Sequence, residues 1–132
     1  MSFLTDNYDN CKIGFKGEDD VRKWFKKNNV RFMQVDIMFK HEGRWCLGEI
    51  KTQEKFVAPP YDGHGLPQWQ IDRRMELFKD TGITPYLIVY DLDDKCLYIE
   101  KFEVLLSKDY FKTKGEKPRV VFKLDSFKKV EI

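Results

Sequence analysis

Two acids and a lysine, Asp36, Glu49 and Lys51, lie in two segments whose composition predicts neighbouring β-strands. The first segment, residues 31–39, reads RFMQVDIMF, and the second, residues 44–51, reads RWCLGEIK. Both are rich in the β-branched, aromatic and other apolar residues that favour strands. Carboxylates are good ligands for Mg²⁺, and an ammonium group stabilises negative charge on a phosphate. This combination suits metal-assisted cleavage of a phosphodiester bond.

The residues between the two segments predict a tight hairpin that would bring these three side chains to one place. Gly43 follows Glu42, and glycine readily adopts the positive φ that such turns require. If these two residues form the loop, Asp36 lies directly opposite Glu49, and Lys51 shares their face of the sheet. Two facing carboxylates repel, so we expect that removing either acid stabilises the metal-free protein. A divalent cation between them would remove the repulsion.

A solvent-facing hairpin is the simpler alternative, because 35% of the residues are charged and carboxylates then meet often by chance. The neighbours of the two acids argue against it. Asp36 lies within Val-Asp-Ile-Met-Phe and Glu49 within Leu-Gly-Glu-Ile, which are runs typical of buried strands. An unpaired acid is costly in such surroundings. We therefore favour a functional site over an ordinary surface.

Length and composition predict one folded domain. The chain has 132 residues, of which 42% are hydrophobic and 15% aromatic, and this is enough for a single core. We expect the domain to span residues 1–132, with its core at about 14–102 and a C-terminal extension at 103–132. The formal net charge is only +2, so contact with nucleic acid must depend on a local basic patch.

The cysteines and the apolar runs predict a cytoplasmic protein. The three cysteines are widely spaced and include no C-x-x-C pair, which argues against a disulfide framework and against a zinc ribbon. No apolar run approaches the length of a membrane span, and residues 1–10 lack the features of a signal peptide. We therefore expect a reduced intracellular protein with no membrane partner.

Hydrophobic periodicity and turn residues predict an α/β domain. Residues 1–14 are expected to form a loose arm, and residues 52–66 an irregular loop, because Pro59-Pro60 and the Asp-Gly-His-Gly run disfavour regular structure. The expected order is αββαββ with a C-terminal appendage, which predicts a mixed central β-sheet flanked by helices. The expected elements are a helix at 17–28, strands at 31–39 and 44–51, a helix at 67–80, and strands at 84–91, 96–102 and 119–124.

Both predicted helices carry polar residues beside an apolar stripe. Glu18 borders the stripe of the first helix, although capping of the helix would explain it equally well. Gln70 and Arg74 border the stripe of the second helix, and Gln68 is a rival to Gln70. The stripes consist of Val21, Trp24 and Phe25 in the first helix, and of Ile71, Met75 and Phe78 in the second.

His64 lies in the predicted loop that follows the second strand, and long loops in this position often contact substrate. No second histidine stands at a spacing suitable for a metal site. We therefore expect His64 to have a structural role or to contact the substrate.

These residues, in this order, resemble the PD-(D/E)XK nuclease superfamily, over about residues 14–91. The pattern consists of a helix acid (Glu18), a strand Asp (Asp36), the tripeptide Glu49-Ile50-Lys51, and a helix with Gln70. Within the superfamily, the small size and the order of the motifs look most like Holliday junction resolvases. Val35 replaces the proline that the family often has before the Asp. The resemblance implies a restriction-endonuclease-like fold and a nuclease that acts on DNA as a homodimer.

The resemblance also implies roles for individual residues. Asp36, Glu49 and the Ile50 carbonyl would hold Mg²⁺, for which Mn²⁺ would substitute, and Glu18 would bind a second metal. Lys51 would orient or deprotonate the attacking water, and Gln70 would position that water or a phosphate oxygen. The expected contacts to the DNA backbone come from Arg74, with Lys55, Arg73, Lys79 and His64 as further candidates, although exposed cations are often only solvated surface.

Three functions remain open from the sequence. The first is a Mg²⁺-dependent endodeoxyribonuclease that acts on branched, Holliday junction-like DNA in recombination. The second is a restriction-type or replication-associated nuclease with the same chemistry. The third is a nucleic-acid-binding module that keeps the fold without cleaving.

Overall fold

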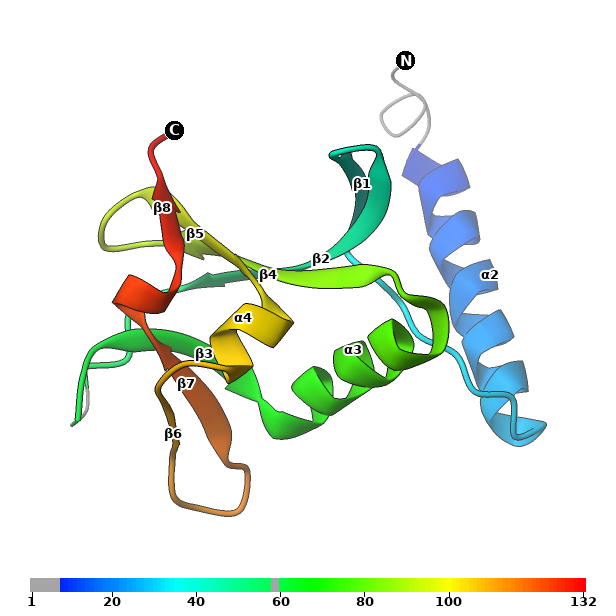
Figure 1. Ribbon diagram of the computed structural model, residues 1–132. Helices are drawn as coiled ribbons and strands as arrows, with labels where there is room; N and C mark the ends of the chain where they lie inside the picture. The colour runs from blue at the N-terminus through cyan, green and yellow to red at the C-terminus, as the bar shows by residue number, and fades with distance from the viewer. Residues whose placement is uncertain (1–7, 58–59) are drawn as a thin grey trace. The chain divides into compact units, whose positions relative to one another are not determined.

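The computed structural model describes residues 8–57 and 60–132 (Figure 1). The chain divides into two compact units, Met1–Gln34 and Val35–Ile132. No helix in the described part of the chain is long and apolar enough to cross a membrane.

The first unit contains one long helix, α2 (Tyr8–Lys27), which begins well before the predicted start at residue 17. The prediction of a loose arm is therefore wrong for residues 8–14, and its remaining residues lie outside the described part. Helix α2 runs through Gly17, since one glycine inside a helix costs only about 1 kcal/mol relative to alanine. The Phe25 ring packs against Phe32, with centroids 5.6 Å apart, in the segment that follows α2.

The second unit is built on a five-stranded sheet with the order β1-β2-β4-β5-β8. Strands β2 and β4 run parallel, and the other neighbouring pairs are antiparallel. The sheet is therefore mixed, which confirms the predicted α/β class. Its strands are β1 (Ile37–His41), β2 (Arg44–Gln53), β4 (Thr84–Asp91), β5 (Cys96–Lys101) and β8 (Lys128–Val130).

The β1–β2 hairpin has the predicted turn and register. Glu42 and Gly43 form its loop with φ values of 50° and 77°, as a two-residue turn with two positive φ angles requires. The paired residues run from His41 opposite Arg44 to Ile37 opposite Gly48. The first strand is shorter than predicted, because residues 31–36 contain no strand.

A second sheet of three strands, in the order β3-β7-β6, is the main departure from the predicted fold. It contains β3 (Gly63–Pro67), β7 (Arg119–Lys123) and β6 (Tyr110–Lys112). Strand β3 lies where we expected an irregular loop. At Gly63 and Gly65 a Cβ atom would collide with backbone oxygens of β7, so these glycines allow two strands to approach closely.

The core lies between the two sheets and two helices, α3 (Gln68–Thr81) and α4 (Phe102–Leu106). Helix α3 and strands β4 and β5 lie close to their predicted positions, whereas α4, β6, β8 and the short 3-10 helix η1 (Leu124–Ser126) were not predicted. In Figure 1, α3, α4 and the small sheet lie on one side of the five-stranded sheet. The core residues include Leu66, Ile71, Leu87, Val89, Phe102, Leu105, Val120 and Phe122.

Candidate active site around Glu49

Strand β2 presents Glu49 and Lys51 on the same face of the five-stranded sheet. In the parallel pairing of β2 with β4, Glu49 lies beside Leu87 and Lys51 beside Val89. Leu87 and Val89 belong to the core cluster, so both polar residues share the side of the sheet on which that core packs. Only 6% of the Glu49 surface is exposed, and a carboxylate at this depth requires a partner.

Arg74 on α3 is that partner. Its Nε and Nη2 atoms both donate hydrogen bonds to Oε2 of Glu49, at 3.1 and 2.7 Å. Arg74 itself is only 8% exposed, so the two charges form a buried ion pair. Sequence analysis placed Arg74 on the DNA backbone. In the structure its guanidinium instead donates hydrogen bonds to Glu49.

Lys51 lies on the other side of the same carboxylate. Its Nζ atom is 3.8 Å from Oε1 of Glu49. Glu49 therefore has a cation beside each of its oxygens, an arginine at Oε2 and a lysine at Oε1. Lys51 is partly exposed, so its ammonium group remains accessible to a ligand.

Asp36 is fixed to the same strand by a hydrogen bond. The backbone N–H of Ile50 donates to Oδ2 of Asp36 at 2.8 Å. Asp36 lies one residue before β1 and is exposed, whereas Glu49 is buried. The hairpin thus places one exposed and one buried acid beside Ile50, but Asp36 lies outside β1, so the predicted pairing of Asp36 with Glu49 is not part of the observed ladder.

The donor atoms available here fit a hard divalent cation. Among the described residues there is no group of three or more His, Cys, Asp or Glu side chains that could hold a metal. Mg²⁺, however, is often bound through one or two carboxylates together with water and phosphate oxygens of the substrate. Asp36 and Glu49 supply two carboxylates, and the Ile50 carbonyl is a further oxygen ligand on the same strand.

Two other predicted site residues have different surroundings. Gln70 lies one helical turn before Arg74 on α3, and its Oε1 atom is buried without a hydrogen-bond partner in the described part of the chain. Glu18 lies on α2 in the other unit, where its side chain is 66% exposed and 3.9 Å from Arg22.

His64 does not contact solvent, so the interpretation as a substrate contact is wrong and the structural role holds. It is completely buried, and its Nε2 donates to Oδ2 of Asp91 at 2.6 Å. Its Nδ1 faces Oε1 of Gln53 at 2.9 Å, and Gln53 is itself bonded to both backbone groups of Gly65. This cluster joins the start of β3 to the ends of β2 and β4.

Lys55 belongs to the same cluster, which corrects its assignment to the phosphate track. Its Nζ lies 3.0 Å from Asp91 and 2.9 Å from Asp94, and only 12% of its side chain is exposed. Burial alone would raise the pKa of Asp91, but hydrogen bonds from the Asp94 backbone, His64 and Lys55 hold it at about 2. Burial lowers the pKa of His64, and the hydrogen bond to Asp91 opposes this effect.

Arg73 remains on the surface. Its guanidinium lies over the exposed Trp69 ring, 5.6 Å from the centroid. Lys79 is also exposed on α3. Both cations are available to a ligand, unlike Lys55 and Arg74.

Sequence analysis missed the partners that neutralise the buried charges. Arg74 was identified as a site residue but not as the partner of Glu49, and Gln53 and Asp91 were not identified at all. A signal for Asp91 was present, since it ends an apolar strand and is followed by two further acids.

The site therefore brings one exposed carboxylate, one buried carboxylate and a partly exposed ammonium group to strand β2 and its hairpin. Comparisons of this chain with protein-family models, with curated proteins and with solved structures give no match.

Proposed function

We propose that this chain is a metal-dependent endonuclease that hydrolyses phosphodiester bonds in DNA and has a restriction-endonuclease-like core. The observation that carries the proposal is the position of Asp36, Glu49 and Lys51 on one hairpin, with a buried acid beside an accessible ammonium. The parallel β2 and β4 strands, connected through α3, support the proposed core.

Asp36, Glu49 and the Ile50 carbonyl are the proposed ligands of Mg²⁺ or Mn²⁺. The bound metal would polarise the phosphate and lower the pKa of water. The buried side of Glu49 stays bonded to Arg74, so Oε1 is the oxygen that faces a ligand.

Lys51 is proposed to act at the reacting phosphate. Its ammonium group would neutralise charge that develops on the phosphate oxygens and hold the attacking water. Gln70 is proposed to position that water, because a buried Oε1 without a protein partner is satisfied by a donor such as water. Arg74 is proposed as a positioning residue that orients Glu49, and Arg73 and Lys79 as contacts to the DNA backbone.

Branched DNA is the proposed substrate, and a homodimer is the proposed assembly. Cleavage of a four-way junction requires cuts in two strands, and two copies of the chain would supply two sites. A restriction-type or replication-associated nuclease would use the same residues on linear DNA.

A second candidate is a nucleic-acid-binding module without catalysis. The observation that favours it is the pair of hydrogen bonds from Arg74, which satisfies Glu49 without any metal. On this alternative, Lys51 and the exposed cations would bind phosphates while no bond is broken.

The test is nicking of a supercoiled plasmid and of a synthetic four-way junction, each with Mg²⁺ and with EDTA. We expect Mg²⁺-dependent cleavage by the wild type and loss of cleavage in Asp36→Asn, an exposed position at which the fold should tolerate the change. Asp80→Asn is the matched control, since Asp80 is also an exposed aspartate. Equal cleavage by Asp36→Asn and the wild type would reject the site, and DNA binding without cleavage would favour the module.

A further inference from the structure

The β6–β7 hairpin and its flanking residues have a larger net positive charge than the chain as a whole. Residues 108–123 contain six basic and two acidic side chains, so this segment alone has a net charge of +4. The whole chain has a net charge of +2, so the residues outside this segment together have a net negative charge. The basic residues are Lys108, Lys112, Lys114, Lys117, Arg119 and Lys123.

The described residues give the basic side chains at the tip of the hairpin no ion pair, although Glu116 belongs to the same loop. Thr113 and Arg119 close the loop, because the Thr113 N–H donates to the Arg119 carbonyl and the Arg119 N–H donates to Oγ1 of Thr113, both at 2.9 Å. Four basic residues at this tip are exposed, and none has an ion pair within the described ranges. We call them the tip cations: Lys112, Lys114, Lys117 and Arg119.

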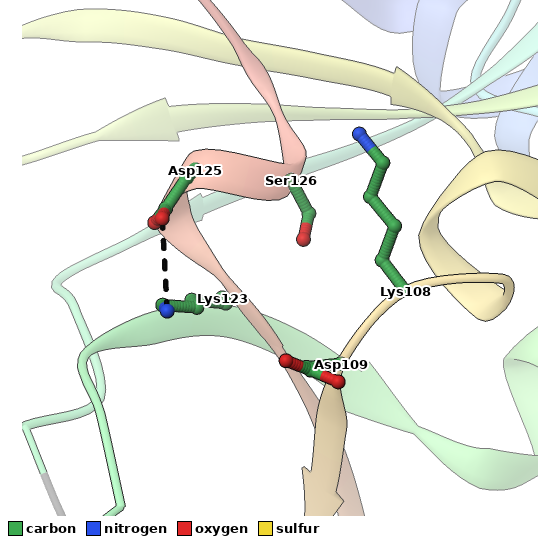
Figure 2. A pocket seen from close by; sticks show the side chains of 5 residues that line it. All are labelled: Lys108, Asp109, Lys123, Asp125 and Ser126. Carbon is green, nitrogen blue, oxygen red and sulfur yellow. Dashed lines mark ion pairs between the residues drawn. The ribbon is translucent and has the colours of Figure 1, made fainter.

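The base of the hairpin has a different charge pattern. A hollow of about 360 Å³ lies there, lined by Lys108, Asp109, Lys123, Asp125 and Ser126. Figure 2 shows the Lys123–Asp125 pair, 3.6 Å apart, with Lys108 across the hollow. Acids and bases nearly balance at the base, so it does not attract an anion as the tip does.

Strand pairing holds the base of the hairpin in place. Strand β7 pairs with β3 on one side and β6 on the other, and Arg119 lies opposite Pro67, the residue before α3. The rings of Tyr61 and Phe111 lie 5.2 Å apart and support the sheet, with Lys123 over Tyr61. In Figure 1 the hairpin projects away from the five-stranded sheet, on the side where α3 lies.

We propose that the tip cations bind the sugar-phosphate backbone of double-stranded DNA, with the β-hairpin at the major groove. The major groove of B-form DNA admits a two-stranded β-ribbon, whereas that of an RNA duplex is too narrow. Cations without carboxylate partners bind phosphates by releasing the counterions of the duplex. The inference rests on the proposed function for its choice of DNA, and it assigns duplex contact to a segment remote in sequence from the Asp36–Lys51 motif.

The experiment measures binding in EDTA, so that it does not depend on cleavage. Fluorescence anisotropy would follow a labelled 30-base-pair DNA duplex, a matched RNA duplex and single-stranded DNA over a range of salt concentrations. The test variant is Lys114→Gln/Lys117→Gln. The same positions changed to arginine keep the charge, and Lys27→Gln/Lys128→Gln removes two exposed lysines elsewhere.

Each phosphate contact contributes about 0.9 to the slope of log K against log salt. We expect the test variant to reduce that slope by about 1 to 2 and to weaken binding of duplex DNA roughly tenfold, with an unchanged melting temperature. The arginine variant and the control should bind like the wild type. The inference would be overturned if the test variant kept the wild-type salt slope, or if the lysine control lost as much DNA affinity as the test variant. It would also be overturned if the wild type did not bind duplex DNA or bound the RNA duplex more tightly. A wild type that binds duplex DNA through the tip but does not cleave would instead reject only the nuclease.

Discussion

Replacement of Glu49 by alanine should strongly destabilise the protein in metal-free buffer. The expectation from sequence was the opposite, because two facing acids repel and loss of one should relieve the repulsion. The structure reverses this sign for Glu49, since its carboxylate is bonded twice to a guanidinium that is only 8% exposed. Alanine would remove both of these hydrogen bonds from a guanidinium that stays buried.

The size of the effect follows from the burial of both partners. Removal of one member of a buried ion pair costs about 3–5 kcal/mol, and a domain is stable by only about 5–15 kcal/mol. For a domain of this size, the melting temperature should fall by about 10–20 °C. Asp36→Ala is the comparison, because Asp36 is exposed and loses only its hydrogen bond from Ile50. Its melting temperature should change much less.

The assay is urea denaturation in EDTA. It compares the wild type with Glu49→Ala, with Asp36→Ala and with the double variant Glu49→Leu/Arg74→Leu. Replacing both charges of a buried pair by apolar residues is often neutral or stabilising, so the double variant should be more stable than Glu49→Ala. A Glu49→Ala protein within about 1 kcal/mol of the wild type, or more stable than it, would refute the buried pair and with it the positioning role of Arg74.

Three further predictions concern Lys51, Gln70 and Asp91. Lys51→Ala should lower the single-turnover rate of DNA cleavage by roughly two to four orders of magnitude with little change in DNA affinity, and a loss confined to affinity would make Lys51 a phosphate anchor only. Gln70→Ala should reduce the cleavage rate more than the melting temperature, and a change in melting temperature alone would mean that the residue is structural. Asp91, whose pKa is held at about 2 against an ordinary 3.8, should contribute about 2 kcal/mol of stability above pH 5 that is lost as the pH falls through 2. The free energy of unfolding, measured from denaturation curves, should therefore differ less between pH 6 and pH 2 in Asp91→Asn than in the wild type. An equal difference in both proteins would contradict the lowered pKa of Asp91.

The elements that could be predicted from the sequence are those whose determinants are local. The β1–β2 turn required only two residues of positive φ between apolar runs, so its register followed from Glu42 and Gly43. Helix α3 begins directly after Pro67 and has Gly82 at its C-cap with φ of 75°, both of which are local signals.

Strand β7 was predicted at 119–124, but the small sheet that it forms could not be predicted, because the contacts that build this sheet join residues far apart in the sequence. Gly63 and Gly65 are typical of a turn when read alone. They belong to a strand because the backbone of β7, some 55 positions later, approaches too closely for a Cβ atom. His64 between them is likewise explained only by Asp91 and Gln53, which sequence spacing does not connect to it.

The candidate site shows the same division between local and distant causes. The alternation of faces in β2 was sufficient to place Glu49 and Lys51 together, whereas Asp36 lies just before β1 and is held by the backbone N–H of Ile50. The charge that stabilises Glu49 comes from Arg74, which reaches it only because α3 packs against the sheet. A buried acid among apolar residues indicates that some cation must be near, but the sequence does not reveal whether that cation is a side chain or a metal. In this protein Arg74 bonds one oxygen of Glu49 and Lys51 lies beside the other, so the fold retains a buried acid through side-chain cations, and the proposed metal would have to bind at the oxygen beside Lys51.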